Sequence, residues 1–206
     1  IEVYGTLEQN AAWGTDSPYV ISGSLIVNVG VSITLQPGTV VKGKGGSSEL
    51  VVNGTLVADG TPTSPIVFTS LRDDGYGGDS NFDLDATTPA SADWTGIGFA
   101  ASAVNNVLDQ VIVRYGGYPS GTFGSSCNVY AGTSGLIISS STISDASSGD
   151  GISVVNASPE ISHNVIEQHS VGIRVNGGNP TISGNAILNN SVGVTGGSPG
   201  NVVLAE

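Results

Sequence analysis

The chain has few basic residues. Only 5 of its 206 residues are Lys or Arg, against 17 Asp or Glu, which gives a formal net charge of −12. So acidic a surface repels the phosphates of nucleic acid, and we expect no nucleic-acid partner. A strongly anionic polymer is also a poor partner unless a cation lies between it and the protein.

Cysteine, methionine and long apolar runs are scarce or absent. The single cysteine, Cys127, excludes an internal disulfide, which a secreted protein with a large enough core does not need. The chain begins at Ile1 and contains no Met, so we expect a processed or excised segment whose signal peptide or anchor lies outside it. No apolar run reaches the roughly 20 residues that cross a bilayer, so we expect no membrane span.

What is abundant is typical of strands and tight turns. Glycine accounts for 31 residues, and Val, Ile, Leu and Ala occur in short runs such as SLIVN, SITLQ and ELVVN, separated by turn signals such as PG, NG and DG. No break in composition divides the chain. We therefore predict one all-β domain covering residues 1–206.

The C-terminal third contains an internal repeat. The segments GISVVNASPEISHNVIEQHSV, GIRVNGGNPTISGNAILNNSV and GVTGG begin at Gly151, Gly172 and Gly193, a constant period of 21 residues. An earlier copy, LIISSSTISDASSGDGI, fits the same pattern with two extra residues before Gly151. A period near 21, with Gly and Asn recurring where they would break helices, indicates one coil of a solenoid made of short strands.

Residues at equal positions of the repeat should stack. Parallel strands lie about 4.8 Å apart, so Ile would stand above Ile inside the coil. Asn164 above Asn185 would form an amide ladder at a bend, extended by Ser141. We predict a parallel β-helix of roughly eight to nine coils, with two loop insertions at about 71–93 and 116–126. Insertions of this kind leave a solenoid on one side and often carry its function.

These repeats resemble those of the pectate-lyase-like superfamily. The N-terminal stretches VISGSLIVNVGVSITLQPGTVVKGKG, GTLVADGTPTSPIVFTS, DDGYGGDSNFD and DWTGIGF look like right-handed β-helix segments of bacterial surface and secreted proteins. The resemblance implies a right-handed parallel β-helix that is secreted or displayed at the cell surface. It does not specify an activity, because the superfamily includes lyases, hydrolases, epimerases, adhesins and passive stalks.

An acidic cluster in the first insertion is the strongest local signal. DSNFDLD places oxygen ligands at alternate positions, a spacing that can wrap a calcium ion, although Leu84 stands where an EF-hand has glycine. Repulsion among so many carboxylates favours a counterion. The alternative is a solvated acidic loop with Asx turns. The expected metal ligands are Asp79, Asn81, Asp83 and Asp85, with Asp73 and Asp74 nearby.

Aromatic residues gather in or beside the two insertions. Flat rings next to polar groups are the usual means of binding sugars, so these residues are candidate ligand-binding groups; the alternative is that they cover the hydrophobic side of the rod. They are Tyr76, Tyr115, Tyr118 and Phe123.

Candidates for catalysis are sparse. The resemblance implies that an eliminating enzyme would use Arg or Lys beside calcium, and here Arg114 with Asp109 would be the pair. The alternative for the basic residues is that they are exposed strand cations; they are Lys42, Lys44, Arg72, Arg114 and Arg174. Glycoside hydrolysis needs two carboxylates on a rigid surface, which a loop provides poorly.

The sequence therefore favours a non-catalytic extracellular module that presents loops to a polysaccharide or cell-surface glycan and is stabilised by calcium. A calcium-dependent, lyase-like enzyme is the first alternative, and a pure spacer or filament subunit is the second. The open ends of a solenoid expose strand edges, so end-to-end self-association or flanking domains are expected.

Overall fold

The chain forms a solenoid of parallel strands. The computed structural model describes residues 1–84 and 86–197, and these contain strands, turns and loops but no helix. None of this described part could therefore cross a membrane as a helix. Each pairing between named strands is parallel, as the repeat predicted.

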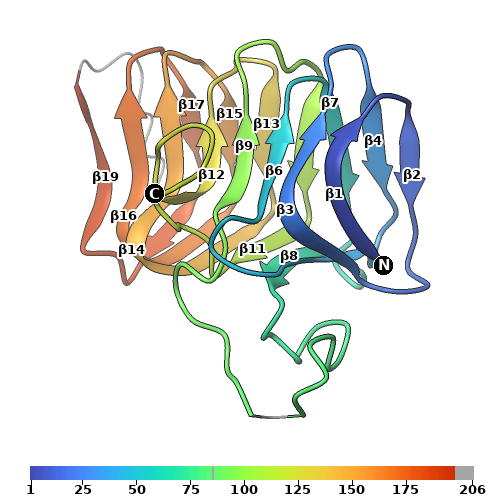
Figure 1. The fold of residues 1–206 in the computed structure, drawn as a ribbon. Coiled ribbons are helices and arrows are strands. Elements are labelled where there is room, and N and C mark those ends of the chain that lie inside the picture. The colour runs from blue at the N-terminus through green and yellow to red at the C-terminus, as the bar shows by residue number, and fades with distance from the viewer. Residues whose placement is uncertain (85, 198–206) are drawn as a thin grey trace.

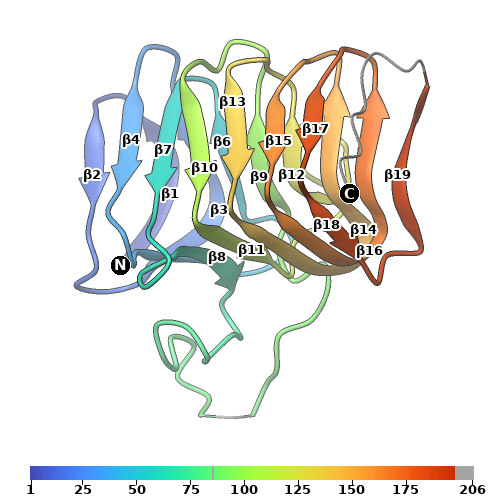
Figure 2. The same ribbon diagram turned by 180° about the vertical axis from the view of Figure 1, so that it is seen from behind.

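The strands build three faces that run the length of the rod (Figures 1 and 2). Face C, on the far side in Figure 1, is a separate seven-stranded sheet. It contains β2 (Ala11–Trp13), β4 (Ser32–Leu35), β7 (Thr55–Asp59), β10 (Asn106–Asp109), β13 (Leu136–Ser139), β15 (Glu160–Ser162) and β17 (Thr181–Ser183).

Faces A and B belong to one twelve-stranded sheet that bends at a corner. Face A includes β5 (Val40–Gly43), β8 (Ile66–Ser70), β11 (Val111–Arg114) and β18 (Ala186–Leu188). Face B includes β6 (Glu49–Val52), β9 (Gly96–Phe99), β12 (Cys127–Ala131) and β19 (Val192–Gly197). Long strands pass from face A to face B without a break: β1 (Glu2–Leu7), β3 (Tyr19–Val27), β14 (Thr142–Val155) and β16 (Val165–Asn176).

Counting along faces A and B gives eight coils in the described residues, which we call rungs, in agreement with the predicted eight to nine. The first rung pairs on one side only, since β1 contacts β3 and β2 contacts β4. This open edge is where the expected end-to-end contact or flanking domain would attach, and that expectation stays a prediction.

The stacked side chains of the repeat lie as predicted. On face C, Ile138 pairs with Ile161, which in turn pairs with Ile182, and each is at most 1% exposed. At the bend between faces C and A, Asn164 Nδ2 donates to Asn185 Oδ1 at 2.9 Å. Asn164 Oδ1 accepts the amide of Ser141 at 3.0 Å, so the hydroxyl residue does extend the ladder.

The two additional residues before Gly151 are accommodated at the A–B corner. Ala146 pairs with His169 and Asp150 pairs with Val171, with an irregularity between the two pairs. Two residues therefore loop out of β14 at this corner while the register resumes on both faces.

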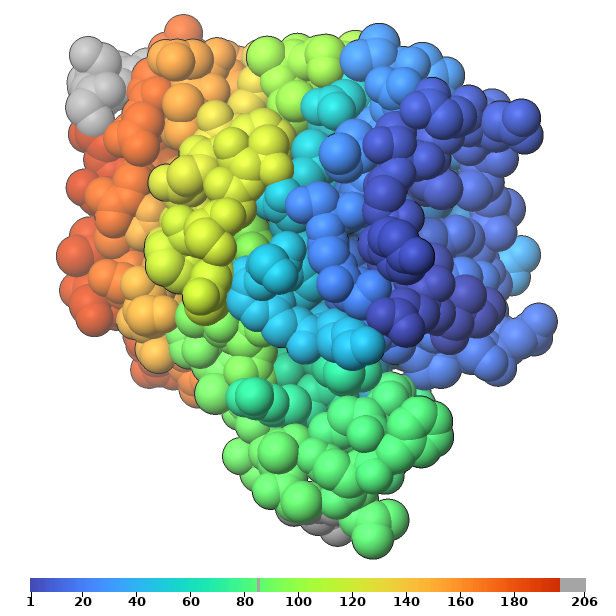
Figure 3. Space-filling model, in the orientation of Figure 1, coloured from blue at the N-terminus to red at the C-terminus, as the bar shows by residue number. Residues whose placement is uncertain are grey.

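Both predicted insertions leave this corner in neighbouring rungs. The first connects β8 on face A to β9 on face B, and the second connects β11 to β12. In Figure 3 the first insertion projects below the body of the rod as a distinct lobe. We call residues 71–95 insertion 1 and residues 115–126 insertion 2. Because both arise at one corner, the chemistry that they carry gathers there.

Candidate functional site at the insertion corner

A buried lysine attaches insertion 1 to face A. The side chain of Lys42, on β5, is fully buried, and its ammonium donates to the carbonyl oxygens of Asp73 at 3.0 Å and Gly78 at 2.7 Å. Burial lowers the pKa of Lys42, while Asp74, Asp73 and Asp79 oppose that shift. The alternative that Lys42 is an exposed strand cation is therefore wrong, because insertion 1 folds over it.

Beyond Lys42, three predicted ligands converge. Carboxylate oxygens of Asp74, Asp79 and Asp83 lie within 4.8 Å of one another. Asp79 accepts the amides of Asp83 at 3.2 Å and Leu84 at 3.0 Å, which shapes the loop. Oδ1 of Asn81 and Oδ1 of Asp83 are buried and accept no hydrogen bond from the described residues. Hard oxygen ligands of this kind fit calcium, while Asp85 lies outside the described residues.

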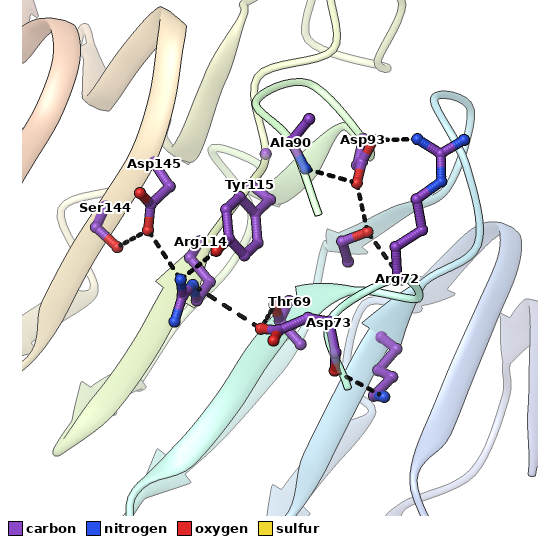
Figure 4. Close-up of polar contacts among 12 residues, drawn as sticks. Thr69, Arg72, Asp73, Ala90, Asp93, Arg114, Tyr115, Ser144 and Asp145 are labelled. Carbon is purple, nitrogen blue, oxygen red and sulfur yellow. Dashed lines mark hydrogen bonds and ion pairs between the residues drawn. The ribbon is translucent and has the colours of Figure 1, made fainter. Parts of the chain in front are cut away.

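Asp73, also predicted as a ligand, does not belong to this cluster: its buried side chain points towards Thr69 and Arg114 (Figure 4). Its Oδ2 accepts the hydroxyl of Thr69 at 2.6 Å and lies 3.9 Å from Nε of Arg114. A second carboxylate, that of Asp145, lies 3.3 Å from the other side of the guanidinium. Arg114 also covers the ring of Tyr115 at 4.4 Å from its centroid and donates to its hydroxyl. These contacts make Arg114 a bridge across three rungs of face A.

Arg72 and Asp93 close the base of insertion 1 (Figure 4). Arg72 donates to Asp93 Oδ1 at 2.9 Å, and Asp93 Oδ2 accepts the hydroxyl of Ser70 at 2.6 Å and the amide of Ala90 at 3.0 Å. The beginning and end of the insertion are thereby held together.

Insertion 2 is fixed to face B by a buried glutamate. The carboxylate of Glu49 accepts the hydroxyl of Ser24 and the amide of Thr122, each at 2.8 Å, and also the hydroxyl of Thr122. The ring of Phe123 then lies on Gly98, where an added Cβ would come within 2.3 Å of it. Glycine at this position of β9 is what admits the ring.

The same insertion provides an aromatic pair. Phe123 stacks on Tyr130 of β12 with ring centroids 4.4 Å apart and an interplanar angle of 10°. Tyr118 lies over Gly46 in the same manner, with contacts of 2.5 Å to an added Cβ, and is 38% exposed. Close approach to glycine flattens both rings against the rod.

Two grooves border insertion 2. The corner groove, of about 400 Å³, lies between the insertions and is lined by Lys44, Arg72, Asn81, Asp83, Thr87 and Tyr118, among others. The face-B groove, of about 430 Å³, is lined by Phe123, Tyr130, Asp150, Ser153, Arg174 and Asn176, among others. Two of the predicted ligand-binding aromatics, Tyr118 and Phe123, therefore lie at grooves.

The other two predicted aromatics have different surroundings. Tyr115 packs against the core and beneath Arg114, and burial raises the pKa of its hydroxyl. Tyr76 lies half-buried within insertion 1, where its amide bonds the carbonyl of Asp73 at 3.5 Å. Neither lines the corner groove or the face-B groove.

The suggested enzymatic pair is not brought together. Arg114 lies on face A, whereas Asp109 ends β10 on face C and accepts the hydroxyl of Ser139 at 2.6 Å. Neither residue lines the two grooves.

Sequence reasoning missed Tyr130 and Ser153 at the face-B groove and named Arg174 only among the basic residues. Tyr130, Ser153 and Arg174 are register partners in one column, in which Ser153 is covered and only 1% exposed. Arg174 donates to both oxygens of Asp150, at 2.6 and 2.9 Å, and these bonds raise the pKa of Arg174. Ser153 and Arg174 stand one 21-residue period apart, so extending the repeat to its outward positions would have placed them side by side.

A buried polar column lies inside the corner, under insertion 2. Asn128 Oδ1 accepts the amide of Gly116 at 2.8 Å, and its Nδ2 lies 3.1 Å from Nε2 of His169. On the other side, Nδ1 of His169 lies 3.1 Å from Asn190 Oδ1. Burial lowers the pKa of His169 to about 4. The neutral ring, protonated at Nδ1, satisfies both neighbours.

Two family models match the chain. The one described as a pectate-lyase like beta helix domain matches residues 5–137, and the one described as a right handed beta helix region matches residues 80–205. No curated protein and no solved structure matches the chain. Each family match covers more than half of the residues, and together with the parallel rungs they show that the chain belongs to the right-handed, pectate-lyase-like β-helix family.

Proposed function

We propose that the chain is a non-catalytic extracellular module that binds a polysaccharide or cell-surface glycan at the grooves beside insertion 2. The observation that carries this proposal is the stacked pair of Phe123 and Tyr130 at the edge of a polar groove. Aromatic faces bordered by hydrogen-bonding groups are suited to the mixed apolar and polar surface of a sugar. The extracellular location rests on the resemblance to surface and secreted proteins.

Binding of the intact chain to an immobilised glycan array tests this proposal. We expect at least one polysaccharide class to bind, and Phe123→Ala to weaken that binding relative to the matched control Phe82→Ala, whose ring is 91% exposed on insertion 1. Absence of binding across plant, algal and microbial polysaccharides would favour the spacer or filament subunit, which needs no ligand.

Calcium as a stabiliser of insertion 1 is the second part of the proposal. Its support is the convergence of Asp74, Asp79 and Asp83, together with the buried Oδ1 atoms of Asn81 and Asp83. Lys42 lies on the inner side of this cluster and donates to main-chain carbonyls, and Oδ1 of Asn81 and of Asp83 accepts no hydrogen bond from the described residues.

Thermal unfolding with calcium and with a chelator tests the metal. We expect calcium to raise the midpoint, since a ligand that binds only the folded state stabilises it. The double variant Asp79→Asn/Asp83→Asn should lose this increase, whereas Glu167→Gln on β16 should keep it. An unchanged midpoint in the parent chain would remove calcium from the proposal.

The lyase-like alternative is favoured by one observation, the 3.9 Å approach of Arg114 to Asp73, next to the acidic cluster. Against it, the guanidinium is enclosed by Asp73, Asp145 and Tyr115 and lines neither groove. Formation of unsaturated uronate from pectin or alginate, followed in the near ultraviolet and lost in Arg114→Gln, would establish the enzyme and overturn the non-catalytic proposal.

A further inference from the structure

The face-B groove follows the axis of the solenoid across successive rungs. It lies over β12, β14 and β16, whose register column contains Tyr130, Ser153 and Arg174 in order. Neighbouring members of such a column are about 4.8 Å apart. An aromatic platform therefore stands at one end of the groove and a guanidinium at the other, while Ser153 between them is only 1% exposed.

The charges of this groove cancel. Among the residues that line it, only Asp150 and Arg174 carry a charge at neutral pH. Their charges are opposite, and two hydrogen bonds of 2.6 and 2.9 Å join them. The carboxylate side chain is 9% exposed, so the guanidinium covers it, while the Arg174 side chain remains 38% exposed to the groove. The floor can donate and accept hydrogen bonds but offers no net charge to a ligand.

We propose that this groove selects an uncharged glycan chain lying along the solenoid axis. One sugar would rest against the stacked Tyr130–Phe123 pair, and hydroxyls further along would bond the exposed Asn176 and the exposed side of Arg174. This inference rests on the proposed glycan binding and names the ligand class. A uronate polymer is disfavoured because Asp150 already holds the single cation of the groove and because the protein carries a net charge of −12.

Affinity electrophoresis of the intact chain tests the ligand class. The gels would contain neutral polymers (glucan, xylan, mannan, galactan) or acidic ones (polygalacturonate, alginate), each with a chelator so that a metal on insertion 1 does not contribute. We expect retardation by a neutral polymer, unchanged between low and high salt because no charge pair forms with the ligand.

Three variants locate the binding. Tyr130→Ala should weaken neutral binding roughly tenfold by removing the platform. Asp150→Asn, which is nearly isosteric, should release Arg174 and add salt-sensitive binding of polygalacturonate. Tyr4→Ala serves as the matched control, because Tyr4 is 73% exposed and lies on β1. Thermal unfolding of each variant confirms that it is folded.

The possible outcomes distinguish failure of the neutral ligand class from failure of the proposed glycan binding. Binding of acidic polymers alone would overturn the neutral ligand class and leave glycan binding intact. If both Tyr130→Ala and Asp150→Asn leave the binding of neutral polymers unchanged, the face-B groove is not the binding site. Binding of no polymer at all would instead overturn the proposed glycan binding itself.

Discussion

Asn164 donates its side-chain amide to Oδ1 of Asn185 at 2.9 Å, one rung further along the solenoid. The same amide also reaches the carbonyl of Ile138 at 2.9 Å, and Asn164 Oδ1 accepts the amide of Ser141. A single buried side chain thus links its own rung to the rung before it and the rung after it.

Asn164→Ala should destabilise the chain by about 3 kcal/mol, because it leaves several buried donors and acceptors without partners. The measurement is the free energy of unfolding from denaturant titration. Asn179→Ala, at an exposed position between β16 and β17, is the control and should change little. Equal effects of the two substitutions would mean that the ladder does not hold the rungs together.

The C-terminal rungs could be predicted almost residue by residue because their period is exact in sequence. Ile161 above Ile182 and Asn164 above Asn185 follow from 21-residue spacing alone. The N-terminal rungs vary in length. In one rung two separate strands, β5 and β6, form faces A and B, whereas in the rung before it the single strand β3 forms both faces. Only the general fold was therefore predictable there.

The candidate site was less predictable because its contacts join residues far apart in sequence. Lys42 and the carbonyl of Gly78 are separated by 36 positions, and Glu49 and Thr122 by 73. No local pattern indicates that a strand lysine will be covered by a loop. The acidic spacing pointed to carboxylates that do converge, those of Asp79 and Asp83, but it did not indicate that Asp73 would turn inward to Thr69.

Lys42→Met should loosen insertion 1. Methionine fills similar space but leaves the carbonyls of Asp73 and Gly78 without a donor and the nearby carboxylates without their cation, at a cost of about 2 to 4 kcal/mol. Limited proteolysis should show faster cleavage within residues 71–95. Lys44→Met provides the control, since the Lys44 side chain is 52% exposed and pairs with the exposed Glu2 at 3.1 Å. Equal cleavage rates in the two variants would contradict the role of Lys42.

Gly98→Ala should displace the ring of Phe123. The new methyl group would come within 2.3 Å of that ring, so insertion 2 must shift, at a cost of about 1 to 3 kcal/mol. Near-ultraviolet circular dichroism reports the loss of the fixed Phe123–Tyr130 pair, and glycan binding should fall with it. Gly45→Ala is the control, because an added Cβ there meets nothing within 4 Å. An unchanged aromatic spectrum in Gly98→Ala would show that the ring does not depend on this glycine.

His169 should make the fold sensitive to mild acid. Burial lowers its pKa from 6.5 in the unfolded chain to about 4, so between these values the unfolded state binds a proton that the folded state does not. Stability from this group is therefore complete above pH 6.5, is lost as the pH falls towards 4, and changes no further below that. The total loss is about 3 kcal/mol, since each pKa unit corresponds to 1.36 kcal/mol.

Comparison with His169→Gln isolates this contribution from the carboxylates that face the ring, Asp145 and Asp150. Glutamine retains one hydrogen-bonding end between Asn128 and Asn190 but does not titrate. The difference in unfolding free energy between parent and variant should shrink or reverse as the pH is lowered from 7 to 4. A constant difference across that range would mean that the imidazole is not held neutral by its burial, and that the polar column tolerates a charged ring.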